Sequence, residues 1–404
     1  MNLKTTVSMT PAPVAPAGRV GRRVYLDHAA SAPVRPVVAS RMLEVLSATG
    51  GNASSAHAEG RQARAILEQA RAEVASLAGC RPEAVIFTSG GTEANNLAVL
   101  GAAHADRRRR HLVVSAVEHA SVLEPCRALT RAGFEWTVVP PAPDGRVDAG
   151  TMAAALRPDT ALCALMLANN EVGALQPVVA VAAACRRQGV PLLVDAVAAA
   201  GRVPLAAATA AADFVSLAAH KLGGPQGAGA LIVAADRDLA PPWRGGSQER
   251  RWRPGTEAVA VLAGFGCAAR LALIDDGREP ARLRRLSSRL AKAVLAVCPE
   301  AVPTGPDDLA QRLPGLVSFV FPALDGEALR TRLDLDGVAV GAGAACSSGA
   351  AMASHVLAAM GYPSEACRAA VRLSLGWNTR AADVDRAAAA LGAAVALQRR
   401  SRAG

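Results

Sequence analysis

Short apolar runs alternate with longer amphipathic stretches through the first two thirds of this 404-residue chain. Runs of this kind, bounded by turn residues, are typical of buried strands, and they occupy residues 84–88, 111–117, 161–168, 190–196, 213–219 and 229–234. Helical stretches rich in Ala and Arg lie between most of them, at 63–78, 122–132 and 178–188. The alternation predicts an α/β fold with a mostly parallel sheet covered by helices on both faces, and ligands of such sheets bind at the carboxyl ends of the strands.

After about residue 264 the pattern changes to a long Arg-rich helix over 268–297, a strand over 315–321, a loop rich in Gly and Ala, and closing helices. We therefore predict a large domain at 24–267 and a smaller α+β domain at 268–404, to which N-terminal residues also contribute. Residues 1–23 contain no continuous apolar segment, which predicts a disordered arm and not a signal peptide. A transit peptide stays open as an alternative, because this arm is basic and carries no acidic residue.

The net charge and the cysteine positions argue against several classes of protein. The formal net charge of +10 and the arginines at 107–110 are compatible with a nucleic-acid surface. No aromatic residues interleave with that run, so nucleic-acid binding is disfavoured and an acidic protein partner is the alternative. Eight scattered cysteines without a Cys-x-x-Cys pair argue against a zinc site and a disulfide framework, and for a reducing, cytoplasmic compartment. No segment is long and apolar enough to predict a membrane span.

Lysine is rare in this chain, and one lysine occupies an unusual place. Lys221 is one of only three lysines, with Lys4 and Lys292, among many arginines. It stands between an apolar run and a glycine-rich turn, in the sequence AHKLGGPQG at 219–227. Arginine does not lose its proton to attack a carbonyl, whereas lysine does, so Lys221 is a candidate for forming a Schiff base.

Other polar residues follow predicted strands. Asp195 ends the strand at 190–196, where a buried carboxylate needs a cationic partner or serves as a helix cap. The sequence TSGGTEANN at 88–96 joins a strand to a helix, and its small residues and backbone N–H groups favour an anion such as phosphate, although a plain turn is the alternative. His119 follows the strand at 111–117 and is a candidate base or stacking residue. The pairing of a lysine with an aspartate is what pyridoxal phosphate requires.

With these motifs in hand, the chain resembles the cysteine desulfurases, the NifS/IscS-like group of the class V pyridoxal phosphate-dependent aminotransferase family. The resemblance runs from about Tyr25 to the C-terminus, and the order and spacing of its short motifs are specific. The motifs are LDHAA at 26–30, GNASSAH at 51–57, TSGGTEANN at 88–96, EH at 118–119, NNEVG at 169–173, DA at 195–196, HK at 220–221, RPGTE at 253–257, ACSS at 345–348 and VRLSLG at 371–376.

The resemblance implies a type I fold of pyridoxal phosphate-dependent transferases, with 24–267 as the cofactor-binding domain. It implies that Lys221 binds the cofactor covalently, that Asp195 pairs with its ring nitrogen and that His119 stacks on its ring. Asn170 would contact the phenolic oxygen. The phosphate would be held by residues of the TSGGTEANN turn, of the HK motif and of a second subunit, namely Gly91, Thr92, His220 and the partner's Thr256, so a homodimer is expected. Asn170 and Arg372 would hold the carboxylate of the substrate, L-cysteine.

Cys346 decides the activity that the resemblance implies. It lies among small residues, in GAGAACSSGA at 341–350, which predicts a mobile loop suited to a nucleophile that takes sulfur from a cofactor-bound cysteine. The products would be L-alanine and a persulfide on Cys346, which passes sulfur to an acceptor protein of iron–sulfur cluster assembly or of a thiolation pathway. A small buried cysteine is the alternative reading. No metal site is predicted, apart from a transient contact of Cys346 with an iron–sulfur cluster.

The chain departs from the family pattern at three alanines. Ala198 replaces the usual Gln three residues after the Asp, Ala218 replaces a hydroxyl residue two before the His, and Ala258 replaces the Asn after Gly-Thr-Glu. The first two changes remove donors to the cofactor and predict weaker binding. Two other functions therefore stay open. One is a divergent class V enzyme, a carbon–sulfur lyase or aminotransferase acting on another amino acid, and the other is a non-catalytic scaffold that binds the cofactor weakly.

Overall fold

The structure, a computed structural model, describes residues 23–274, 277–322, 324–343 and 353–403. The predicted N-terminal arm, apart from its last residue, and the predicted nucleophile Cys346 lie outside the described residues.

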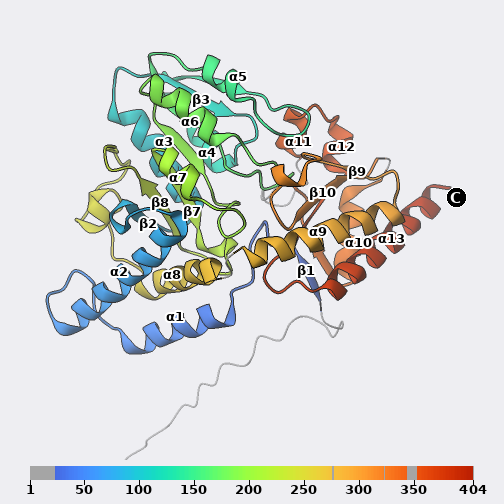
Figure 1. Cartoon of the computed structure of the whole chain (residues 1–404), viewed down its shortest axis with the longest axis horizontal. Coiled ribbons are helices and arrows are strands. Elements are labelled where there is room, and N and C mark those ends of the chain that lie inside the picture. Colours follow the sequence, from blue (N-terminus) through green and yellow to red (C-terminus); the bar gives the residue numbers. More distant parts are fainter. Residues whose placement is uncertain (1–22, 275–276, 323, 344–352, 404) are drawn as a thin grey trace, which may run out of the picture.

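A seven-stranded sheet forms the centre of the larger lobe, in the order β2-β8-β7-β6-β5-β3-β4 (Figure 1). Its strands are β2 (Val85–Thr88), β3 (His111–Ser115), β4 (Glu135–Val139), β5 (Thr160–Ala164), β6 (Leu192–Asp195), β7 (Phe214–Ala218) and β8 (Gly229–Val233). Neighbouring strands are parallel except at β8, which is antiparallel to both β2 and β7. The mostly parallel α/β sheet predicted from the apolar runs is therefore confirmed.

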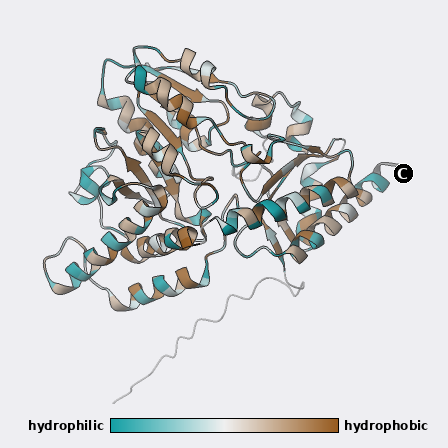
Figure 2. Cartoon of the chain, in the orientation of Figure 1, coloured by the Kyte–Doolittle hydropathy of each residue, from teal (hydrophilic) through white to brown (hydrophobic). Residues whose placement is uncertain are grey.

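Helices cover both faces of this sheet, because the strands are apolar on both sides. On β3, Val113 enters one hydrophobic core while Leu112 and Val114 enter the other. Helices α3 (Gly91–Ala105) and α4 (Ala120–Thr130) contribute to the second core, and α2 (Ala58–Ala78), α6 (Val178–Arg187) and α7 (Ala206–Ala211) contribute to the first. The hydropathy colouring shows the brown strands enclosed by helices that turn their teal residues outward (Figure 2).

The sequence reading missed strand β4. Its residues are exposed or half-buried except for Val139, and it lies at the edge of the sheet, where only β3 pairs with it. A strand with one open side needs no continuous apolar run, so its sequence, EWTVV, gave a weak signal.

A second lobe is built around two small sheets. Strand β10 (Leu316–Val320) lies between β9 (Val302–Pro303) and β12 (Ala370–Ser374) with antiparallel pairing, and β1 (Val24–Leu26) pairs in parallel with β11 (Val338–Val340). Helices α9 (Arg278–Val297), α10 (Gly326–Leu335) and α13 (Ala381–Ala403) cover these strands (Figure 1). Because Val24 and Leu26 enter the same core as Phe319 and Leu373, the N-terminal strand packs with the C-terminal part of the chain.

The single long helix expected at 268–297 is wrong. The chain forms two helices, α8 (Val259–Ile274) and α9, and Gly277, the residue before α9, has a positive φ of 74°, a conformation that favours glycine and interrupts a continuous right-handed helix. Helix α8 packs on α1 (Pro36–Ala48) and α2, whereas α9 packs on α13. The predicted boundary between residues 267 and 268 therefore falls inside α8, and the division into domains stays a prediction.

The remaining helices are short, and most of the described cysteines are buried. Helix α5 spans Ala149–Ala154, α11 spans His355–Ala359 and α12 spans Ser364–Arg368. Seven of the eight cysteines lie in the described ranges, none forms a disulfide there, and all but the half-buried Cys80 are buried. Within those same ranges, no helix has the length and apolar character needed to cross a membrane.

Candidate active site

One cavity of about 320 Å³ lies at the carboxyl ends of the parallel strands. Of the predicted site residues, seven line this cavity: Gly91, Thr92, His119, Asn170, Asp195, His220 and Lys221. They follow β2, β3, β5, β6 and β7, whose carboxyl ends meet at one edge of the sheet. The fold thus gathers side chains from five separate parts of the sequence.

Lys221 ends a short 3-10 turn that follows β7. Its Nζ donates to the carbonyl oxygens of Ala29 at 2.5 Å and Ala30 at 2.8 Å. Burial, with a further contribution from the Arg372 guanidinium, lowers the pKa of Lys221 to about 8. A part of the amine is therefore neutral near physiological pH, and the neutral amine is the form that attacks a carbonyl.

Asp195 is the last residue of β6 and is only 5% exposed. Its Oδ2 accepts a hydrogen bond from Asn95 Nδ2 at 2.8 Å, and its Oδ1 accepts one from the backbone N–H of Val197 at 2.9 Å. Both hydrogen bonds fix the orientation of the carboxylate in the cavity wall. The site consequently offers a fixed negative charge to a cationic group.

A chain of hydrogen bonds connects this carboxylate to His119. Asn95 Nδ2 also donates to Ser121 Oγ at 2.9 Å, and Ser121 Oγ lies 2.8 Å from His119 Nδ1. That Nδ1 also accepts from the backbone N–H of Ser121, so the neutral imidazole carries its proton on Nε2. Burial lowers the pKa of His119, which favours the neutral ring.

Asn95 was not singled out from the sequence. It stands one helical turn after Gly91 in α3, so both residues present to the same side of that helix. This i, i+4 spacing within the TSGGTEANN motif is the signal that would have found it.

The first turn of α3 provides the anion cradle expected from its glycines. A Cβ on Gly91 would stand 2.7 Å from Val197 Cγ2, so a larger residue has no room there. The unpaired backbone N–H groups at the start of a helix of 15 residues favour a negative charge. His220 also lines the cavity, with its Nδ1 3.3 Å from Ser31 Oγ, and burial lowers its pKa to about 4. A neutral His220 still offers a hydrogen-bond donor or acceptor.

Arg372 and Thr256 do not line this cavity in their own chain. Arg372, 1% exposed, donates from Nη2 to Asp27 Oδ1 at 2.8 Å and from Nη1 to the carbonyl oxygen of Asn170 at 2.9 Å. It therefore lies behind a cavity residue, with Asp27 compensating its charge. Thr256 is exposed, in the loop that precedes α8.

Gly343 and Ser354, which lie on either side of residues 344–352, are both close to Glu171, the residue after Asn170. A Cβ built on Gly343 would stand 3.3 Å from Glu171 Oε2, and Ser354 Oγ donates to the same oxygen at 2.5 Å. His355 Nε2 lies 2.9 Å from the carbonyl oxygen of Glu118, a residue whose pKa burial raises to about 8. Sequence reasoning missed Glu171, Ser354 and His355. Cys346 belongs to this segment and lies outside the described residues.

Two of the three alanines that depart from the family pattern, Ala198 and Ala218, lie at the site. Ala198 lines the cavity. Ala218 is fully buried at the end of β7, and its Cβ lies 3.7 Å from the position that a Cβ on Gly91 would take. Each alanine therefore stands where a donor side chain would reach the cavity or the start of α3.

Comparisons with known proteins agree with this geometry. The family model described as aminotransferase class-V matches residues 24–387. The chain belongs to this family. Its members depend on pyridoxal phosphate, and the chain falls within their cysteine desulfurase group. The IscS-like cysteine desulfurase of Mycobacterium tuberculosis is 42% identical over 384 residues, which cover 93% of this chain and 97% of the relative.

Solved structures place the fold in the same class V group. A NifS-like protein superposes with a TM-score of 0.86 at 30% identity, over 93% of this chain and 100% of that protein. A structure described as SspA in complex with cysteine gives a TM-score of 0.75 at 29% identity, over 87% of this chain and 98% of that protein. The type I fold of pyridoxal phosphate-dependent cysteine desulfurases, expected from the motifs, is therefore confirmed.

Proposed function

We propose that this cavity binds pyridoxal phosphate and removes sulfur from L-cysteine, giving L-alanine and a persulfide on Cys346. One observation carries the proposal: the amine of Lys221, with its lowered pKa, and the buried carboxylate of Asp195 line the same cavity as the start of helix α3. An amine for the aldehyde, an anion for the ring nitrogen and backbone N–H groups for the phosphate are the donor set that this cofactor requires. The residues present therefore fit the group.

Each cavity residue has a role in holding the cofactor. Lys221 would anchor the aldehyde, and Asp195, oriented by Asn95, would keep the ring nitrogen protonated. The first turn of α3 with Thr92, together with His220, would hold the phosphate. His119 would cover one face of the ring, and Asn170 would contact its phenolic oxygen. When bound, pyridoxal phosphate supplies a sink for the electrons released at the substrate carbons.

Arg372 and Asn170 are proposed to hold the carboxylate of cysteine. Arg372 Nε is buried and has no hydrogen-bond partner within the described residues, so one donor of its guanidinium stays available. A carboxylate bound there would sit beside Asn170, whose carbonyl oxygen already accepts from Arg372. This arrangement orients the substrate thiol with respect to the cavity.

The sulfur transfer consumes one thiol of the enzyme and leaves a persulfide. The thiolate of Cys346 attacks the substrate sulfur, so an S–S bond forms while the carbon–sulfur bond of the substrate breaks. The electron pair of that bond passes to the substrate carbon, which takes up a proton to complete alanine. Lys221 and His119, both at the cavity, are the groups that would carry protons during this step.

We further propose that the enzyme is a cytoplasmic homodimer in which Thr256 reaches the partner's phosphate site, and that the persulfide passes to a protein of iron–sulfur assembly or thiolation. The free and mostly buried cysteines are consistent with a reducing compartment. A divergent class V lyase or aminotransferase is the second candidate, because Ala198 and Ala218 both alter the cofactor end of the cavity.

Two variants test the proposal. Lys221→Ala should lose the yellow colour of the bound cofactor and all alanine formation, since Lys4 and Lys292 are distant in sequence and Lys292 does not line the cavity. Cys346→Ser should keep the colour and bind cysteine but form no persulfide, because a hydroxyl is a far weaker acceptor of sulfur. Unchanged alanine formation in Lys221→Ala would refute the cofactor assignment. Full desulfurase activity in Cys346→Ser would favour direct lyase chemistry.

A further inference from the structure

Three consecutive residues other than glycine adopt the left-handed conformation at one turn. Glu249, Arg250 and Arg251 have φ values of 44°, 58° and 67°. This conformation is unfavourable for residues with a Cβ, and a run of three persists only where surrounding contacts enforce it. The turn lies shortly before the loop at 253–257, in which Thr256 is exposed.

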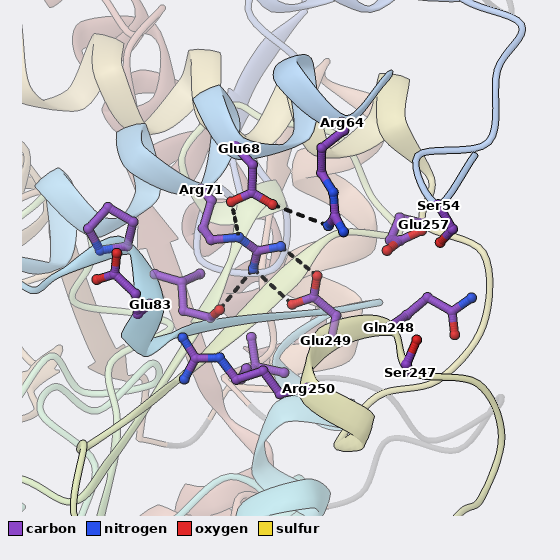
Figure 3. Close-up of a pocket in the computed structure, with 13 residues that line it drawn as sticks. Ser54, Arg64, Glu68, Arg71, Glu83, Ser247, Gln248, Glu249, Arg250 and Glu257 are labelled. Carbon is purple, nitrogen blue, oxygen red and sulfur yellow. Dashed lines mark hydrogen bonds and ion pairs between the residues drawn. The ribbon is translucent and has the colours of Figure 1, made fainter. Parts of the chain in front are cut away.

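A buried ion pair holds this turn in place (Figure 3). Arg71 of helix α2 donates from Nη1 to Glu249 Oε2 at 2.9 Å and from Nη2 to Glu249 Oε1 at 2.7 Å. Glu249 Oε2 also accepts from the backbone N–H of Phe87 at 2.7 Å, and Arg71 Nη1 donates to the carbonyl oxygen of Val85 at 2.9 Å. The guanidinium carbon lies 4.7 Å from the centre of the Phe87 ring. Every one of these partners belongs to α2 or β2, so the turn is attached to the rigid part of the large lobe.

The loop after the turn has a second attachment near the cavity. Arg253 Nε donates to Glu93 Oε1 at 2.8 Å, and Glu93 follows Thr92 in the first turn of α3. Thr256, three residues further on, is nevertheless exposed and does not line the cavity of its own chain. The loop therefore leaves the lobe at a fixed place and presents its hydroxyl outward.

We propose that the Arg71–Glu249 pair of one subunit serves the cavity of the other subunit. The pair holds the strained turn so that Thr256 reaches the phosphate site of the second subunit. This inference rests on the proposed function, in which Thr256 contacts the partner's cofactor. The two hydrogen bonds of the pair fix the rotation of the Glu249 side chain and its distance from Arg71. The neutral amide of a glutamine at position 249 would hold the turn less firmly. Weakening the pair in one subunit should therefore harm the cavity of the other subunit.

Mixed dimers separate action in trans from a local effect. Two differently tagged chains are co-expressed and purified through both tags, and Lys221→Ala inactivates the cavity of one subunit. In the first dimer, Lys221→Ala and Glu249→Gln lie in the same chain beside a wild-type partner, so the intact cavity receives the altered loop. In the second dimer they lie in opposite chains, so the intact cavity receives a normal loop. Dissociation of pyridoxal phosphate from the single intact cavity is measured by absorbance.

The first dimer should bind the cofactor about tenfold more weakly or worse, and the second should bind like a dimer with Lys221→Ala alone. Glu68→Gln is the matched control, because Glu68 also accepts from Arg71, at 3.0 Å from its Nε, but does not belong to the turn. Neither mixed dimer should change with that variant. Weaker binding in the second dimer, or equal binding in both, would overturn the inference. Arg71→Lys repeats the test from the other side of the pair if Glu249→Gln does not fold.

Thr256→Ala in the same two arrangements tests the proposed function separately. If Thr256→Ala weakens binding only when it lies opposite the intact cavity, the contact in trans stands, and the Glu249→Gln result judges the ion pair alone. If Thr256→Ala changes cofactor binding equally in the two arrangements, the contact with the second subunit is refuted, and the positioning role of the ion pair is refuted with it.

Discussion

Ser354 donates its hydroxyl hydrogen to Glu171 Oε2 across 2.5 Å, and Ser354 Oγ accepts from the backbone N–H of Leu357 at 3.0 Å. The first bond joins the start of helix α11 to the residue next to Asn170 in the cavity wall, and the second caps that helix. One side chain thus ties the chain just after the 344–352 segment to the site. Its effect should fall on the thiol chemistry and not on cofactor binding.

Ser354→Ala should slow persulfide formation several-fold while leaving the affinity for pyridoxal phosphate unchanged. Loss of the cap should also lower the free energy of unfolding by about 1 kcal/mol. Single-turnover formation of persulfide and equilibrium binding of the cofactor measure the two effects on the same preparation. Ser354→Thr, which keeps the hydroxyl, should restore the rate, and a parallel fall in cofactor affinity would contradict the assignment.

Asn95→Ala should weaken cofactor binding, because it removes the donor shared by Asp195 Oδ2 and Ser121 Oγ. A buried acceptor left without its donor costs about 1–3 kcal/mol, which corresponds to a loss of roughly tenfold to a hundredfold. The dissociation constant of pyridoxal phosphate measures it. Asn96→Ala is the neighbouring control, since the Asn96 amide donates to the backbone oxygens of Thr92 and Ser121. Equal losses in the two variants would show that the helix and not the carboxylate is affected.

The double variant Ala198→Gln, Ala218→Ser should bind pyridoxal phosphate more tightly than the wild type. Ala198 lines the cavity and Ala218 lies beside the start of α3, so the new amide and hydroxyl would add donors at the cofactor. Two independent hydrogen bonds contribute about 1–3 kcal/mol, or roughly tenfold to a hundredfold in affinity. Dissociation of the cofactor from both proteins is the measurement. Equal or weaker binding in the variant would indicate a rebuilt pocket and a substrate other than free cysteine.

His28 should make the protein less stable in acid. Burial, reinforced by the nearby Arg202 guanidinium, lowers the pKa of His28 from 6.5 to about 3. Between these pH values the unfolded chain binds a proton that the folded chain does not, so the free energy of unfolding falls as the pH drops through this window. The slope for one such group reaches about 1.4 kcal/mol per pH unit. His220, with its pKa lowered to about 4, acts in the same direction.

Chemical unfolding of wild type and His28→Gln from pH 7 to pH 3 checks this slope. The variant should show a shallower loss of stability toward acid, whatever its stability at pH 7. His104→Gln, at an exposed histidine, should keep the wild-type slope. Identical slopes in all three proteins would exclude His28 as the group responsible.

The sequence predicted the residues that depend on strand position and missed those that depend on contacts across the fold. Asp195 and Lys221 follow buried strands, and parallel strands bring such positions to one edge whatever the rest of the chain does. Asn95 acts on a carboxylate 100 residues away, and Ser354 acts on one 183 residues away. No local pattern specifies such a pair. The break at Gly277 was missed because helix-forming sequence continues on both sides of it.

The burial of the described cysteines has a consequence for selectivity. Burial raises the pKa of the thiols of Cys80 and Cys126, to about 11 and about 12, and raises that of Cys267, Cys298 and Cys367 as well. Such thiols hold little thiolate at neutral pH and have poor access to reagents. An enzyme that handles persulfide sulfur is at risk of modifying its own side chains, and here the competing acceptors are kept protonated inside the two lobes. Electrophilic probes should therefore label this chain at far fewer sites than its eight cysteines would suggest.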